Sequence, residues 1–175
     1  MKDYNYTMMQ IKKESLKLIK HYLYAFPFIV LVSISIAESN DAYLDELITV
    51  PISIKNSQGD NVEFNAYNTS SHSQRRRGLM HIANLPQDKG MLFHFTPPRY
   101  VSMWMKNTLI KLDIIFIDKN KRIIKIHNNA KPLSTKSIYS NKKAEWVLEI
   151  NGGLSEINGL SIGNIVNFET NSIDN

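Results

Sequence analysis

The fold is indicated most directly by residues 103–113, which read Met103-Trp104-Met105-Lys106-Asn107-Thr108-Leu109-Ile110-Lys111-Leu112-Asp113. Bulky residues open this stretch, as is typical of a β-strand, and an apolar run begins again at Leu112. A strand does not need the polar residues in the middle. We therefore expect one strand over residues 101–106, a second over 112–117, and a group of polar side chains where the first strand ends.

Short strands are indicated on both sides of this stretch. Residues 61–66 alternate polar and apolar side chains, as a half-buried strand does, and Pro51 suits a sheet edge or a bulge. Residues 118–121 are a plausible hairpin connection. Further strands are expected at residues 47–54, 91–95, 122–127, 145–150 and 165–168.

Two short helices and one mobile loop complete the expected elements. Ser71 with Gln74 three residues later is a capping-box pattern, and it predicts a helix that ends near Gly78. A single helical turn is expected within residues 154–159. Residues 128–144 are polar and rich in Lys, Ser and Asn, so we expect them to form a mobile loop.

These elements predict a mainly β fold, either a compact β-sandwich of the jelly-roll kind or a partly closed barrel with one or two short helices. The chain has 175 residues, which suits one globular domain. We expect this domain over residues 46–170, with a tail at 171–175. The core is expected to contain Val62, Phe64, Leu79, Leu92, Trp104, Ile114, Phe116, Val147 and Val166.

Residues 1–37 have the pattern of an export signal. Lysines precede the mostly apolar residues 22–36, and Ser35 and Ala37 are the small residues that a signal peptidase recognises. The alternative is an uncleaved N-terminal anchor. Both predict a periplasmic or secreted domain, held at the inner membrane if the leader is not cleaved, with residues 38–45 as a flexible stem.

The charge of the chain gives little support to a nucleic-acid partner. The net charge is +5 in total, and residues 1–37 contribute +3 of it through five lysines and two acidic residues. Residues 38–175 carry the remaining +2, which is too little to argue for nucleic-acid binding. Membrane contact is expected only through the N-terminal segment. The chain has no cysteine, which excludes disulfides, a lipoprotein attachment site and thiol catalysis.

The polar residues between the two central strands are the candidate ligand-binding site. They offer a cationic group, an amide and a hydroxyl, and Arg77 beside Gly78 suits the capture of a carboxylate. The structural alternatives are a turn at Asn107 and an ion pair that holds Asp113 to Lys106 or Arg77. The candidate residues are Arg77, Lys106, Asn107, Thr108, Asp113 and Glu149.

Two kinds of function fit this set of residues. We expect a binding or accessory module that holds a small polar ligand or a protein partner in a cleft. The alternative is a hydrolase-type enzyme with Asp113 as base and Arg77 or Lys106 as stabiliser, and two carboxylates close together would favour it. Because the standard catalytic motifs are absent, the sequence leaves open whether the protein is an enzyme.

A copper site is a further alternative. Met103 and Met105 lie on one face of the expected strand, where thioethers select Cu(I), and Met80, Met91 or His94 are the candidate additional ligands. Methionine pairs on strands usually pack into a core. We therefore predict no metal site and no cofactor.

The motifs in combination resemble a family of small bacterial and archaeal domains, the domain-of-unknown-function 192 family, over roughly residues 47–169. The resemblance is carried by Arg77-Gly78-Leu79-Met80, Leu85-Pro86, Gly90-Met91-Leu92-Phe93-His94-Phe95, Met103-Trp104-Met105-Lys106-Asn107-Thr108, Leu112-Asp113, Phe116-Ile117-Asp118 and Glu149-Ile150-Asn151-Gly152-Gly153.

The resemblance implies a compact, mostly β domain that is often exported, and it implies no reaction. The chain departs from the family pattern at two places. Lys111 stands where the family usually has proline, and residues 128–144 lack the pair of cysteines that many members carry. A disulfide or thiol role suggested for relatives therefore cannot apply to this chain.

Overall fold

The computed structural model describes residues 42–169, so the expected leader, the first part of the stem and the tail lie outside the described residues. From Leu44 onward these residues belong to one unit. Its strands are β1 (Thr49–Lys55), β2 (Asn61–Thr69), β3 (Lys89–Met103), β4 (Leu112–Ile117), β5 (Ile123–Ala130), β6 (Ile138–Asn151) and β7 (Ile165–Asn167), and its helices include α2 (His72–Arg77) and α3 (Leu154–Ile157).

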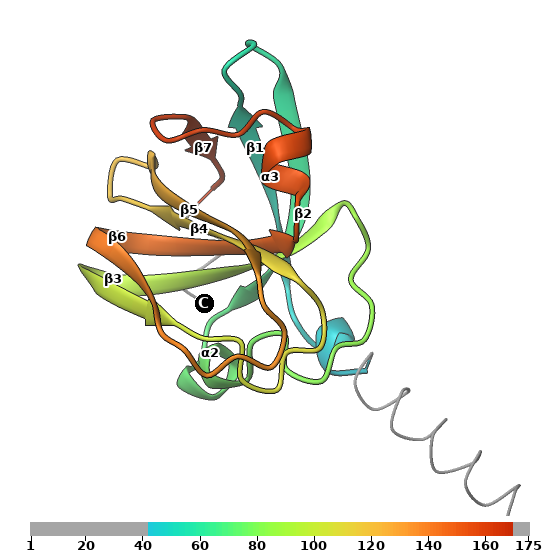
Figure 1. Ribbon diagram of the computed structural model, residues 1–175. Helices are drawn as coiled ribbons and strands as arrows, with labels where there is room; N and C mark the ends of the chain where they lie inside the picture. The colour runs from blue at the N-terminus through green and yellow to red at the C-terminus, as the bar shows by residue number, and fades with distance from the viewer. Residues whose placement is uncertain (1–41, 170–175) are drawn as a thin grey trace, which may run out of the picture. The chain divides into compact units, whose positions relative to one another are not determined.

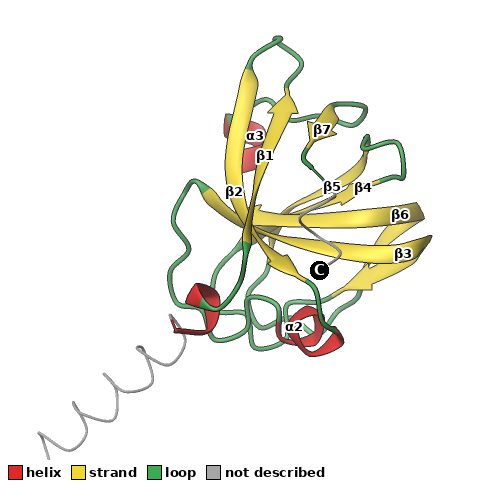
Figure 2. Cartoon of the chain, turned by 180° about the vertical axis from the view of Figure 1, so that it is seen from behind, coloured by secondary structure: helices red, strands yellow, loops and turns green. Residues whose placement is uncertain are grey.

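The seven strands form one curled sheet in the order β5-β4-β6-β3-β2-β1-β7. Figures 1 and 2 show β1 and β2 running steeply across the direction of β3 and β6. The short strand β7 pairs with β1, and a bridge between Arg122 and Ile165 joins β7 to the residue before β5. The two edges of the sheet therefore meet at one end. This is a mainly β fold with a partly closed barrel, as the sequence predicts.

The main core fills the concave side of this sheet. Every second residue of the strands points to it, as the alternation of a strand requires, so Leu148 and Ile150 of β6 lie there with Phe64 and Val166. The remaining large apolar residues face the other way. Phe93, Ile114, Phe116 and Val147 are buried on the outer face of the sheet, which is therefore also covered.

One predicted core residue is wrong. Trp104 is 50% exposed, whereas the other predicted core residues are buried or, for Val62, partly buried. The physical reason is that Trp104 follows the last residue of β3 on the side of Ser102, which is exposed, and not on the side of the buried Val101. The predicted strand at 91–95 and the first three residues of the one at 101–106 belong to this one strand β3, whose pairing with β6 shifts register between His94 and Arg99. Residues 104–106 lie beyond it and are not a strand.

The expectation of a mobile loop at residues 128–144 is also wrong for most of its length. Residues up to Ala130 continue β5, and residues from Ile138 belong to β6. β6 pairs with β3 as far as Met103 opposite Ile138, so hydrogen bonds to a distant strand order a segment whose own composition is polar. At the start of the described chain, residues 42–45 are helical and Leu44 is buried.

The helix cap and the helix end that the sequence predicts around residues 71–78 are present in the structure. Ser71 is the N-cap of α2, and its reciprocal hydrogen bonds with Gln74 form the capping box. The helix ends at Gly78, whose φ of 51° lies in the left-handed region. Among residues 42–169, Pro51 has no strand partner on the β7 side, because β7 pairs with β1 only from Ser53 onward. No helix among residues 42–169 is long and apolar enough to cross a membrane.

Candidate functional site

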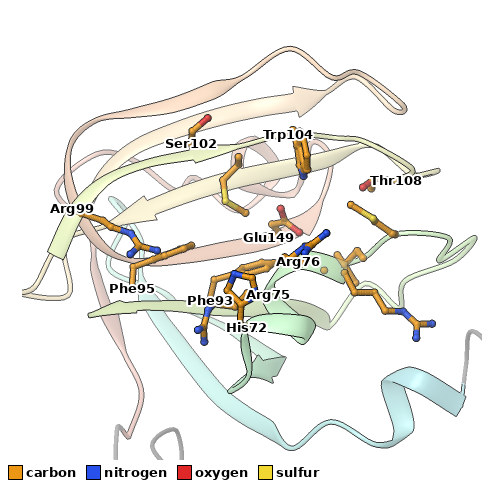
Figure 3. Close-up of a pocket in the computed structure, with 15 residues that line it drawn as sticks. His72, Arg75, Arg76, Phe93, Phe95, Arg99, Ser102, Trp104, Thr108 and Glu149 are labelled. Carbon is orange, nitrogen blue, oxygen red and sulfur yellow. The ribbon is translucent and has the colours of Figure 1, made fainter. Parts of the chain in front are cut away.

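A cavity of about 260 Å³ lies between α2 and the outer face of β3 and β6. One wall consists of α2 and the residues that follow it, as far as Met80, and another consists of β3 and Trp104. Figure 3 shows the carboxyl group of Glu149 pointing into the space between Trp104 and the arginines of α2. The cavity therefore combines basic, aromatic and carboxyl groups from segments far apart in the sequence.

Strand alternation places Glu149 in the cavity. Leu148 and Ile150 point into the main core, so the side chain between them points to the outer face of the sheet. Its neighbours across the sheet are Met91 on β3 and Ile114 on β4, and both are fully buried. The carboxyl group thus sits in a row that is otherwise apolar.

Burial makes Glu149 an unusual acid. Its exposed fraction is 4%, and within the described part of the chain its carboxyl group has neither a hydrogen-bond nor an ion-pair partner. Removal of water from the charged form raises the pKa of Glu149 to about 8. At pH 7 the side chain is therefore mostly protonated, and it can donate one hydrogen bond into the cavity.

The rim of the cavity is basic. Arg75, Arg76 and Arg77 end α2, and Arg99 stands on β3. Arg75 donates to the backbone oxygen of Ser70 at 3.1 Å. The guanidinium of Arg99 lies 5.1 Å from the centre of the Phe95 ring, an arrangement visible in Figure 3. Phe95 therefore supports one of the rim cations and leaves its charge at the cavity mouth.

Some of the residues that follow β3 line the cavity, and others lie outside it. Trp104 and Thr108 line the cavity, whereas Lys106 and Asn107 do not. Lys106 is exposed and its amino group lies 5.5 Å from the centre of the Trp104 ring. Asn107 adopts a φ of 57°, and its carbonyl oxygen accepts from the backbone of His81 at 2.9 Å. This is the turn that the sequence offers as the structural alternative.

Asp113 lies on the opposite side of the sheet. It is fully buried, and its carboxylate accepts three backbone N–H groups, from Asn129 at 2.8 Å, Gly153 at 2.9 Å and Ser155 at 2.8 Å. Ile114, the next residue, pairs with Glu149, so strand alternation turns the Asp113 and Glu149 side chains to opposite faces. The structure therefore does not bring the two carboxyl groups into one cleft.

The predicted set of site residues is thus divided. Arg77, Thr108 and Glu149 line one cavity, whereas Lys106, Asn107 and Asp113 lie outside it. The sequence does not single out Arg75, Arg76, Trp104 or Arg99 as members of a site. A run of arginines at the end of a capped helix is a signal that could have indicated the first two. Nothing in the local sequence indicates Arg99 or the outward orientation of Trp104.

The methionines are also divided. Met80 and Met103 line the cavity, whereas Met91 and Met105 are fully buried away from it. The predicted shared face of Met103 and Met105 does not form, because β3 ends between them. The ring of His94 stacks on Trp146 of the main core, with centroids 3.8 Å apart, so His94 faces the core and does not line the cavity. Residues 42–169 contain no cluster of three or more His, Asp or Glu side chains suited to a metal ion.

The solved structures that are similar to this chain include two from bacteria. One is a putative transcription regulator from Sinorhizobium meliloti 1021, with 34% sequence identity and a TM-score of 0.68 over 70% of this chain and 95% of that chain. The other is a protein of unknown function from Novosphingobium aromaticivorans DSM 12444, with 33% identity and a TM-score of 0.66 over 68% of this chain and 84% of that chain. A comparison with curated proteins gives no match.

The family model DUF192, described as "Uncharacterized ACR", matches residues 53–168. The match covers every strand from the last part of β1 to β7, together with the cavity that contains Glu149. Arg77-Gly78, Gly90-Met91 and Glu149-Ile150, which carry the resemblance seen in the sequence, all lie within it. The chain belongs to the domain-of-unknown-function 192 family.

Proposed function

We propose that this domain binds a small ligand in the cavity around Glu149. The observation that carries the proposal is a carboxyl group that is 4% exposed, lacks a partner within residues 42–169 and points into a cavity. A buried polar group without a hydrogen-bond partner costs free energy of folding. A ligand that accepts or donates a hydrogen bond there would supply the missing partner.

A purely structural role gives no reason for a carboxyl group at this place. The side chains across the sheet, those of Met91 and Ile114, are apolar, and an apolar residue at position 149 would continue their row. Ionisable groups whose pKa burial displaces strongly are concentrated at functional sites. The cost of burying Glu149 is therefore better explained by binding than by packing.

The hydrolase alternative has less support. Asp113, its proposed base, is occupied by three backbone N–H groups and lies on the other face of the sheet. Among the residues that line the cavity, Glu149 is the sole carboxyl group. Acid–base hydrolysis by two carboxyl groups needs a second carboxyl group within about 5–10 Å in the same cleft.

A transcription-regulator role, as named for the Sinorhizobium protein, gains no support from the net charge of +2 on residues 38–175.

The binding proposal is tested by a thermal-shift screen of the purified domain against sugars, organic acids and cell-wall fragments. A ligand that prefers the folded state raises the melting temperature by mass action. We expect at least one hit, whose shift is reduced by Arg76→Gln at the cavity rim and unchanged by Lys142→Gln, which removes a charge elsewhere. Both side chains are exposed, so neither variant should disturb folding. Hits that respond equally to both variants, or no hits, would contradict the proposal.

We also propose that the domain is exported, on the pattern of residues 1–37. The expected result of mass spectrometry on the full chain recovered from the periplasm is an N-terminus at Glu38, the residue after the predicted cleavage site. An intact N-terminus in the membrane fraction would indicate the anchored alternative. Recovery of the intact chain from the cytoplasm alone would contradict export.

A further inference from the structure

We propose, building on the proposed function, that the ligand of the Glu149 cavity is a compact acid, with a carboxylate or phosphate group joined to an apolar body, and that it binds while the Glu149 side chain is protonated. The inference names a ligand class and a proton coupling for the same site. It rests on three features of the cavity, namely its charge, its apolar lining and the buried carboxyl group.

The charge of the cavity favours an anion. Four arginines line it, three from α2 and one from β3, and Glu149 is the single acidic residue that faces them. In the described residues no guanidinium forms an ion pair with Glu149 within 4.0 Å. Planar guanidinium groups bind carboxylate and phosphate oxygens with paired hydrogen bonds. A cationic ligand would instead meet the like charges of Arg75, Arg76 and Arg99.

The lining of the cavity favours an apolar body on that anion. Phe93, Leu79, Met103 and Trp104 contribute hydrocarbon, sulfur and ring surface, and the Trp104 ring is half exposed at the edge. The volume of about 260 Å³ is slightly below the usual range for drug-sized ligands, which starts near 300 Å³. The occupant is therefore a small acid rather than a chain of several sugar units.

The Glu149 carboxyl group couples this binding to a proton. Burial raises its pKa to about 8, so it is mostly neutral at pH 7 and does not repel an anion. The titratable and charged groups that face the Glu149 carboxyl group come from α2, which contributes His72 and three arginines, and from β3, which contributes Arg99. The segment after β3 lines the cavity with Trp104 and Thr108, which do not titrate in this pH range. An anion bound beside Glu149 opposes its ionisation, so binding retains the proton to higher pH.

The experiment is isothermal titration calorimetry with benzoate, phenyl phosphate and the neutral benzamide between pH 7 and about pH 9.5, the range around the pKa of Glu149. We expect the anions to bind and benzamide to bind at least tenfold more weakly, as a rough bound. Which of the two anions binds more tightly distinguishes a carboxylate ligand from a phosphate ligand. Above pH 8 the affinity for the anions should fall by about tenfold per pH unit.

The matched variant is Glu149→Gln, which keeps the shape and a hydrogen-bond donor but cannot ionise. In this variant the affinity for the anions should no longer depend on pH over the same range. Equal binding of benzamide and benzoate, or a wild-type affinity that is independent of pH, would overturn the inference. A hit among neutral ligands in the thermal-shift screen would also overturn it and would leave the proposed binding function standing, whereas the absence of any ligand would overturn both.

Discussion

Replacing Glu149 by glutamine is expected to make the domain more stable at pH 8 by on the order of 4 kcal/mol. The pKa of Glu149 is raised from 4.5 to about 8 in the folded protein, so the folded state holds a proton that the unfolded chain releases. The stability that this group contributes is complete below pH 4.5 and is lost as the pH rises through 8. Glutamine does not titrate, so the free energy of unfolding of the variant should not fall over this pH range.

The measurement is urea unfolding of both proteins at several values between pH 4.5 and pH 8.5. We expect the two unfolding free energies to be similar near pH 4.5 and to separate in favour of Glu149→Gln as the pH rises. Glu63→Gln is the control, because Glu63 is exposed on β2 and away from this cavity. Parallel pH profiles for wild type and Glu149→Gln would show that Glu149 ionises normally in the folded protein, and this prediction would be wrong.

Replacing Asp113 by alanine is expected to destabilise the domain by on the order of 4 kcal/mol. The carboxylate accepts three backbone N–H groups at 2.8–2.9 Å, and it is fully buried. Hydrogen bonds to a charged group each contribute roughly 1.5–3 kcal/mol, and the donors would lose their acceptor together. Domains of this size are typically stable by about 5–15 kcal/mol, so the loss would take a large part of the total.

Asp118→Ala is the matched control for this variant. Asp118 accepts two backbone N–H groups, from Asn120 and Arg122, in the hairpin between β4 and β5, but it is only half-buried. Water can replace its carboxylate there, so we expect a loss of about 1 kcal/mol. If Asp113→Ala does not fold, Asp113→Asn provides the measurement with an isosteric side chain. Equal small losses for the Asp113 and Asp118 variants would contradict the structural role of Asp113.

The two buried carboxyl groups of the sheet therefore have opposite roles. Asp113 accepts three backbone hydrogen bonds, and through them it holds the end of β5 and the start of α3 to β4. Glu149 lies one strand away on the other face, with no partner among the described residues. Asp113 stabilises the folded domain through its hydrogen bonds, whereas burial of Glu149 lowers the stability of the domain. This contrast supports our proposal that Glu149, and not Asp113, contributes to ligand binding.

The sequence by itself determined the fold class and many local elements. Period-two alternation at residues 61–66 predicts a strand, and Ser71 with Gln74 predicts the capped helix, because these signals act between residues close in the chain. The motif around Arg77-Gly78 and Glu149-Ile150 also sufficed to indicate the family. Glu149 is among the candidate residues, and it belongs to the motif Glu149-Ile150-Asn151-Gly152-Gly153 that carries the family resemblance.

Only the tertiary structure decided which of the candidate residues meet. Asp113 and Glu149 belong to neighbouring strands, and the register of β4 and β6, which no local signal specifies, puts their side chains on opposite faces. Trp104 lies just beyond the end of β3 and lines the cavity, and pairing with β3 orders residues 138–144 as strand. Arg99 lines the same cavity as the arginines of α2 although it is far from them in the sequence. These outcomes depend on contacts between segments that are distant in the sequence, and a local sequence pattern does not indicate how strong such contacts are.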